Sequence, residues 1–81
     1  MHKNREFTIS DISAYAESLG YALLFQRYKR VFTLRSLSSP DDWGWMYFPQ
    51  EPEKLIELVD DLSLDEWKIA VKNTIKSING G

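Results

Sequence analysis

The side chains that could do acid–base or nucleophilic chemistry do not combine into a catalytic group. A nucleophile needs a base held beside it, and the only histidine, His2, stands close to the N-terminus, where side chains are poorly positioned. Acidic residues form three neighbouring pairs, Asp41-Asp42, Asp60-Asp61 and Asp65-Glu66. Adjacent residues point in different directions, and acids are common in turns and at helix starts, so we interpret the pairs as capping and solubilising groups. We therefore expect this protein not to be an enzyme.

The same residue types give no metal or cofactor site. The chain has no cysteine, which removes thiolate ligands and disulfides and fits a reducing compartment. The acidic run at 60–66, DDLSLDE, lacks the alternating acids and the glycine of a calcium-binding loop. The four glycines stand at 20, 44, 80 and 81, so they form no phosphate-binding loop. We expect no cofactor and no metal ion.

Aromatic residues give the clearest signal for recognition. Residues 41–49 read DDWGWMYFP and contain two of the three tryptophans. Side chains on a strand alternate between its faces, so Trp43, Trp45 and Tyr47 are expected on one face. Met46 and Phe48 would then meet the core from the other face, where Gly44 allows close approach of a helix.

The aromatic face predicts a protein-binding site. We expect it to lie on the open side of a sheet, beside Gln26, Tyr28 and Arg35, unless the tryptophans are core or fold back over the neighbouring hairpin. Tryptophan, tyrosine and arginine are the residue types enriched at interface hot spots. The leading hypothesis is a small regulatory or inhibitory module that docks on another protein. Its predicted binding residues are Trp43, Trp45, Tyr47, Tyr28 and Arg35.

A basic cluster supports a second hypothesis, nucleic-acid binding. Its residues are Arg27, Tyr28, Lys29, Arg30 and Arg35. The cations could contact phosphates while the tyrosine stacks on a base. Basic residues at a strand edge also protect it against pairing with other chains, which is an ordinary structural use. A third possibility is a homodimer in which two copies close the aromatic face.

A helix and a hairpin must position these residues. Thr8 and Asp11 fit a capping box, and Gly20 suits the left-handed end of the helix that follows. The apolar stripe of this helix is Ile9, Ile12, Ala16 and Leu19. Strands are predicted near 21–28 and 31–37, with a loop of three to five residues, because Lys29-Arg30 does not suit a two-residue turn.

The register of the hairpin decides which side chains share a face. With Tyr28 opposite Val31, one face carries Leu23, Phe25, Phe32 and Leu34, and we expect this face to be the core side. The other carries Ala22, Leu24, Gln26, Tyr28, Val31, Thr33 and Arg35. A third strand is predicted over 43–48, and Pro49 should end it.

Two further helices are predicted towards the C-terminus. Pro52, between Glu51 and Glu53, suits a first helical turn, and Leu55, Ile56, Val59 and Leu62 would form its apolar side. Ser63 and Glu66 predict a second capping box. The last helix then carries the apolar stripe Leu64, Trp67, Val71, Ile75 and Ile78, with Trp67 in the core, and ends at Asn79-Gly80.

The resulting prediction is an α+β fold in the order αβββαα, with the helices on one face of an antiparallel sheet. At 81 residues, 43% hydrophobic and 27% charged, the chain is expected to form one domain over 1–81, with 1–6 as a flexible segment. Net charge is −2, divided as +3 over residues 1–40 and −5 over residues 41–81. No apolar run is long enough for a signal peptide or a membrane span, so a cytoplasmic location is expected.

Overall fold

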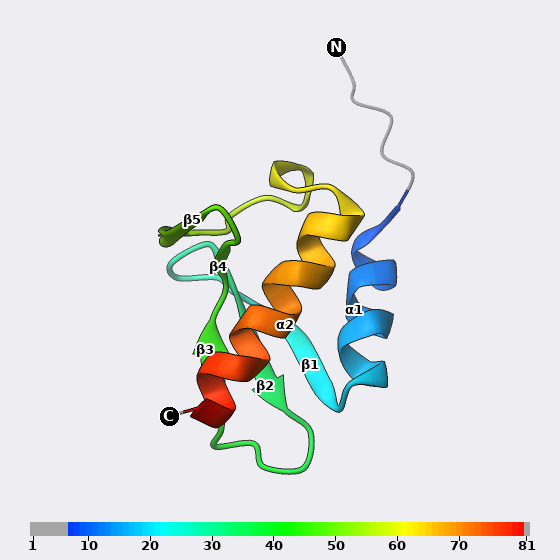
Figure 1. Ribbon diagram of the computed structural model, residues 1–81, viewed down its shortest axis with the longest axis vertical. Helices are drawn as coiled ribbons and strands as arrows, with labels where there is room; N and C mark the ends of the chain where they lie inside the picture. The colour runs from blue at the N-terminus through cyan, green and yellow to red at the C-terminus, as the bar shows by residue number, and fades with distance from the viewer. Residues whose placement is uncertain (1–6, 81) are drawn as a thin grey trace.

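The computed structural model describes residues 7–80, and the segment 1–6, predicted to be flexible, lies outside them, as does His2. The fold belongs to the α+β class, as predicted (Figure 1). Its elements are α1 (Ile9–Ser18), β1 (Tyr21–Gln26), β2 (Val31–Ser36), β3 (Trp43–Trp45), β4 (Tyr47–Phe48), β5 (Glu51–Leu55), the 3-10 helix η1 (Val59–Asp61) and α2 (Leu64–Gly80). No helix within this part of the chain has the length and apolarity needed to cross a membrane.

The first helix begins and ends where its sequence predicts. The backbone N–H of Thr8 donates to the Asp11 carboxylate at 2.9 Å. Gly20 has a φ of 88°, which a glycine adopts without strain, and the chain reverses there into β1. Ile12 and Ala16 are buried, whereas Ile9 and Leu19 are exposed, so only the middle of the predicted stripe reaches the core.

The three-stranded sheet has the order β1-β2-β3 and is antiparallel throughout. Gln26, not Tyr28, lies opposite Val31, because residues 27–30 form a four-residue turn. The Arg30 N–H donates to the Gln26 carbonyl at 2.7 Å, and Arg30 has a φ of 56°. The register differs from the predicted one by two residues, so every side chain of β1 and β2 keeps its predicted face, whereas Tyr28 lies in the turn and not on the strand as predicted.

Both helices pack on one face of this sheet, with α1 against β1 and α2 against β2 and β3 (Figure 1). Leu34 and Trp67 are fully buried there, and the Trp67 ring meets the Phe32 ring edge to face at 5.2 Å. The Trp67 indole N–H donates to the Val59 carbonyl at 2.9 Å. Trp67 is therefore a core residue, as predicted. A Cβ added to Gly44 would lie 3.2 Å from Ile78 Cγ1, so glycine here lets α2 approach the strand.

The predicted third strand is divided at Met46. The Met46 N–H donates to the Phe32 carbonyl at 3.1 Å, but the Phe32 N–H donates to Ile56 at 3.1 Å, and the Ile56 N–H donates to Met46 at 3.0 Å. Ile56 is thus inserted between β2 and the continuing chain, and β4 turns away to pair with β5. Pro49 follows the end of β4, as predicted.

The prediction of a helix after Pro52 is wrong. Glu51–Leu55 form strand β5, and only the short helix η1 lies within the predicted range. Proline is tolerated in this strand because the sheet β4-β5 has only two strands, so β5 is an edge strand. The predicted capping box of the last helix is confirmed: the Glu66 N–H donates to Ser63 Oγ at 3.2 Å, and the Ser63 N–H donates to Glu66 Oε1 at 2.9 Å.

Candidate functional site

The register places both tryptophans of the WGW segment on the sheet face that lies opposite the helices. Trp43 pairs with Arg35, and Trp45 pairs with Thr33. Side chains alternate along a strand, and Leu34 and Gly44 face α2. Trp43 and Trp45 therefore point away from α2. We call this surface the open face; its residues are Ala22, Leu24, Gln26, Val31, Thr33, Arg35, Trp43 and Trp45.

The two tryptophans have different roles on the open face. Their rings meet edge to face, with centroids 5.2 Å apart and planes at 76°. Trp43 is 44% exposed, and Trp45 is half-buried. Thr33, the cross-strand partner of Trp45, is only 1% exposed although no helix covers this face, and its hydroxyl accepts a hydrogen bond from Gln26 Nε2 at 3.2 Å. Trp45 therefore covers the middle of the sheet, while Trp43 is available for contact.

The open face adjoins the basic turn between β1 and β2. Lys29 Nζ lies 5.4 Å from the ring centroid of Trp45, within the range of a cation–π interaction. Arg35 is exposed on the same face, opposite Trp43. The protein-binding residues and the nucleic-acid-binding residues predicted from sequence are thus neighbours on one surface.

Two of the five predicted protein-binding residues lie apart from the open face. Tyr28 is at the tip of the turn and is fully exposed. Tyr47 belongs to β4, beyond the division at Met46, where it pairs with Leu55. The sequence pattern did not reveal this division, because WGWMYF alternates without interruption across Met46. The structure brings together Trp43, Trp45 and Arg35.

Arg35 is the one charged residue among the eight of the open face, and Lys29 of the neighbouring turn adds a second positive charge beside Trp45. None of the eight residues is acidic, and within residues 7–80 neither Lys29 nor Arg35 has a carboxylate at ion-pair distance. Arg27 and Arg30 extend the positive charge along the turn. Asp41 and Asp42 are the acids nearest to Trp43 in sequence; they precede β3, and the Asp42 carbonyl oxygen accepts the Ser36 N–H at 2.9 Å. This surface is suited to binding groups that carry negative charge.

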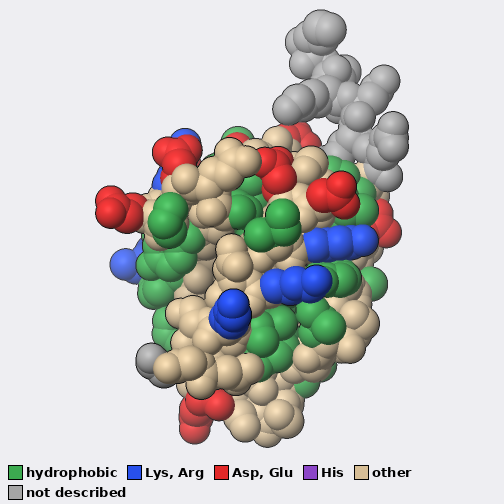
Figure 2. Space-filling model, in the orientation of Figure 1, with side chains coloured by type: hydrophobic (Ala, Val, Ile, Leu, Met, Phe, Trp, Pro, Cys, Tyr) green, Lys and Arg blue, Asp and Glu red, His purple; other side chains and the backbone are tan. Residues whose placement is uncertain are grey.

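The acidic residues gather elsewhere and have local roles. The Asp61 carboxylate accepts the Leu58 N–H at 3.1 Å, and that of Glu66 caps α2. Figure 2 shows the helix side of the molecule, where acids surround the end that carries β5, η1 and the start of α2, and a row of lysines follows α2. The lysines of this helix are Lys68, Lys72 and Lys76. Nowhere in the described ranges do three or more acidic or histidine side chains form a group able to hold a metal ion.

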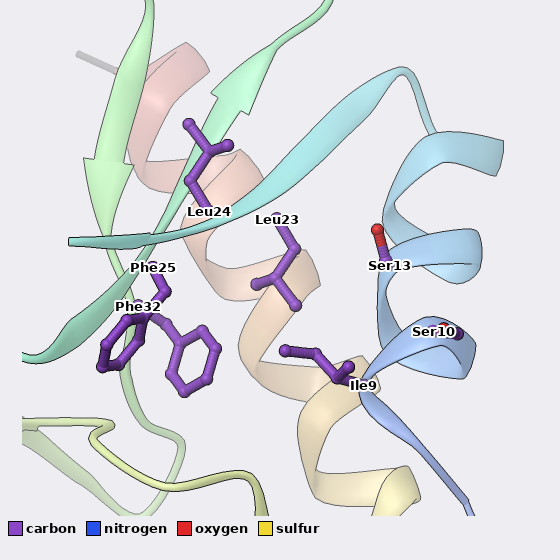
Figure 3. A pocket seen from close by; sticks show the side chains of 7 residues that line it. All are labelled: Ile9, Ser10, Ser13, Leu23, Leu24, Phe25 and Phe32. Carbon is purple, nitrogen blue, oxygen red and sulfur yellow. The ribbon is translucent and has the colours of Figure 1, made fainter. Parts of the chain in front are cut away.

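A hollow between α1 and β1 was not predicted from the sequence (Figure 3). Its volume is about 220 Å³, and its lining residues are Ile9, Ser10, Ser13, Leu23, Leu24, Phe25 and Phe32. Phe25 and Ile9 are both half-exposed at this site, although both were expected in the core. The hollow depends on how the first turn of α1 is spaced from the strand, and apolar periodicity contains no signal for that distance. Its lining is uncharged, so it could accept an apolar group.

Comparison of the chain with protein-family models, with curated proteins and with solved structures found no match.

Proposed function

We propose that this protein is a small, non-enzymatic protein-binding module with a regulatory or inhibitory role, and that it docks through the open face. The observation that carries the proposal is the position of Trp43. This large aromatic side chain is 44% exposed on a sheet face that neither helix covers. Covering a large exposed aromatic side chain removes its apolar surface from water, which is favourable. A face of this kind is therefore suited to burial by a partner.

The surroundings of Trp43 are those of an interface anchor. Trp45 supports its ring edge to face, and Arg35 stands opposite it on the neighbouring strand. Side chains held in one arrangement lose little conformational entropy on binding, which leaves more of the contact free energy for affinity. Tryptophan and arginine are also the residues whose truncation most often removes binding at interfaces.

The charges of the open face favour a different protein over a second copy of this chain. A two-fold interface would bring Lys29 and Arg35 of both copies together, and the face contains no carboxylate to neutralise them. Like charges opposed across an interface cost several kcal/mol in order of magnitude, and a protein that presents acids avoids this cost.

Nucleic-acid binding is the second candidate function, and the turn supports it. Tyr28 is fully exposed between Arg27 and Lys29, so its ring is free to stack on a base while the cations contact phosphates. Trp45 supports it less, because its ring already has the Lys29 ammonium beside it.

Affinity capture from nuclease-treated cell lysate, with immobilised wild-type protein and two variants, tests the proposed function. Trp43→Ala removes the anchor, and the matched control Leu58→Ala removes a side chain that is 62% exposed and is not one of the eight residues of the open face. We expect one or more proteins to bind the wild type and Leu58→Ala, and to be lost with Trp43→Ala. The binding should then be reproduced with the purified partner by calorimetry.

Two results would contradict the proposal. A partner that binds Trp43→Ala as tightly as the wild type would show that the open face is not the interface. A ligand that is present only without nuclease treatment would favour the nucleic-acid function instead.

A further inference from the structure

The outer edge of β3 has free backbone groups directly beside the open face. The Ser36 N–H donates to Asp42 at 2.9 Å, and the Met46 N–H donates to Phe32 at 3.1 Å, which shows that the even-numbered residues of this segment hydrogen-bond to β2. In an antiparallel pair the intervening residues point their N–H and C=O groups the other way. Trp43 and Trp45 therefore direct both backbone groups outward.

These outward groups are unpaired in the described part of the chain. β3 is the last strand of its sheet, and no hydrogen bond joins the N–H or C=O of Trp43 or Trp45 to any residue of 7–80. β5 does not cover this edge, because Ile56 enters on the other side, between Phe32 and Met46. An exposed strand edge of this kind is a template for an added strand.

We infer that the partner contributes an extended peptide that pairs with the outer edge of β3 and presents acidic side chains on the open face. This inference rests on the docking function proposed above and specifies its binding mode and the chemistry of its partner. Peptides bind sheet edges in this way through main-chain hydrogen bonds, and alternate side chains provide the specificity.

Charge complementarity selects acidic residues for one side of the added strand. Side chains of that strand level with Trp43 and Trp45 would point to the open face, since neighbouring strands share their faces. They would meet a surface whose charged groups are Lys29 beside Trp45 and Arg35 opposite Trp43, with no acid among the eight residues of the face. A carboxylate there gains charge-assisted hydrogen bonds, and a cation is repelled.

The other side of the added strand requires an apolar residue. The side chain level with Gly44 would point to the helix side, where Ile78 at the end of α2 is only half-buried. The expected ligand therefore alternates acidic and apolar residues.

The second free edge of the sheet, on β1, lacks this selection. The Leu37 N–H donates to the Gly20 carbonyl, so the even-numbered residues of β1 hydrogen-bond to β2. Leu23 and Phe25 therefore direct their backbone N–H and C=O groups outward. That edge adjoins α1 and the uncharged hollow of Figure 3, so no charge favours one class of peptide. The edge of β3 combines free backbone groups, exposed aromatic surface and charge.

Amide exchange measured by NMR on the full chain tests the inference with a peptide probe, acetylated and amidated Glu-Val-Glu-Val-Glu-Val-Glu. At saturating peptide we expect exchange of the Trp43 and Trp45 backbone amides to slow by about tenfold or more. The Lys-for-Glu peptide should give no protection at the same concentration. A Glu peptide N-methylated at alternate residues should bind at least fivefold more weakly, because its main chain cannot complete the pairing.

A pair of protein variants isolates the backbone contribution. Trp43→Pro removes the outward N–H at the first residue of the strand, where proline is tolerated, and Trp43→Ala removes the side chain only. We expect the proline variant to bind the peptide several-fold more weakly than the alanine variant. If the proline variant does not fold, the N-methylated peptide still decides the question.

Each alternative gives a different result. Shifts of the tryptophan indole signals without protection of the two backbone amides would overturn the added strand but leave docking on the open face intact. Equal protection by the lysine peptide would overturn the acidic partner. Saturation by mixed-sequence single-stranded DNA at a lower concentration than the peptide would assign the surface to nucleic acid. If no signal responds, the added strand is excluded, and affinity capture with Trp43→Ala separately decides the docking function.

Discussion

The backbone N–H of Phe32 donates to the carbonyl oxygen of Ile56, 3.1 Å away, where β2 would otherwise pair with the residue that follows β3. Ile56 in turn donates to Met46, and Met46 donates to Phe32, so the three residues form a closed set of hydrogen bonds. All three side chains are buried, those of Met46 and Ile56 completely. This junction joins the two-stranded sheet to the three-stranded one, because it is the point at which all three chain segments meet.

Shortening Ile56 should therefore destabilise the whole fold. We expect Ile56→Ala to lower the free energy of unfolding by about 2–5 kcal/mol and Ile56→Val by about 0.5–1.5 kcal/mol, as for other buried isoleucines. The control Leu58→Ala, two residues along and 62% exposed, should change it by less than about 0.5 kcal/mol. Urea unfolding measures all three. If Ile56→Ala lowers the free energy of unfolding no more than Leu58→Ala does, the junction is not tightly packed.

The same junction explains why a helix was wrongly predicted after Pro52. Leu55, Ile56, Val59 and Leu62 have helical spacing, and proline with acids suits a first turn. Ile56 is instead buried through its backbone pairing to two distant segments, and Val59 accepts the Trp67 indole N–H. Both contacts are with residues far along the chain or across a turn, and local periodicity cannot represent them.

The faces of the sheet could be predicted because an error of two residues in the turn does not change which strand side chains share a face. Gln26 rather than Tyr28 lies opposite Val31, yet Arg35 and Trp43 still share the open face, since the difference is two residues. Tyr47 shows the limit of this reasoning. Parity places it with the tryptophans only if the strand is continuous, and the insertion of Ile56 interrupts the strand at Met46.

Arg30 supplies a test of the turn that is independent of charge. Its φ of 56° is left-handed, a conformation that costs a residue with a Cβ roughly 1–2 kcal/mol, while glycine costs about 0.5–1 kcal/mol in unfolded-state entropy. We expect Arg30→Gly to be more stable than Arg30→Ala by about 0.5–1 kcal/mol, with the same charge removed in both. Chemical denaturation gives the comparison. Equal stabilities would mean that this residue does not hold the left-handed conformation in solution.

The two tryptophans should differ in what they contribute to stability. Trp45 covers Thr33, whereas Trp43 is 44% exposed and rests on Trp45. We expect Trp45→Ala to cost about 2–4 kcal/mol and Trp43→Ala less than about 1 kcal/mol, measured by thermal and urea unfolding. The reverse order would assign the structural role to Trp43 and would remove it as the anchor of the proposed interface.

Charge reversal distinguishes protein docking from nucleic-acid binding. If an acidic protein segment is the ligand, Lys29→Glu with Arg30→Glu should slow association and weaken binding, but Trp43→Ala should weaken binding more. If nucleic acid is the ligand, the same change should remove most of the affinity, and the wild-type affinity should fall steeply with salt. The matched control is Lys72→Glu with Lys76→Glu, which makes the same charge change on α2. Binding kinetics with the captured partner and with labelled single-stranded DNA, each at two salt concentrations, give the answer. An equal loss in both double variants would indicate a response to net charge alone.

The contact between β3 and α2 can be tested without altering the open face. A Cβ at Gly44 would lie 3.2 Å from Ile78 Cγ1 and 3.5 Å from Thr74 Cγ2, which is closer to Ile78 than most Cβ contacts allow. We expect Gly44→Ala to lower the free energy of unfolding by about 1–2 kcal/mol through overpacking, and to cost much less in a chain that already carries Ile78→Ala. A double-mutant cycle by urea unfolding measures this interaction directly. A cost of Gly44→Ala that is unchanged by Ile78→Ala would place the strain at Thr74 or in the strand itself. Because residue 44 faces α2 and the docking residues face away from it, the folded Gly44→Ala variant should still bind the partner that Trp43→Ala loses.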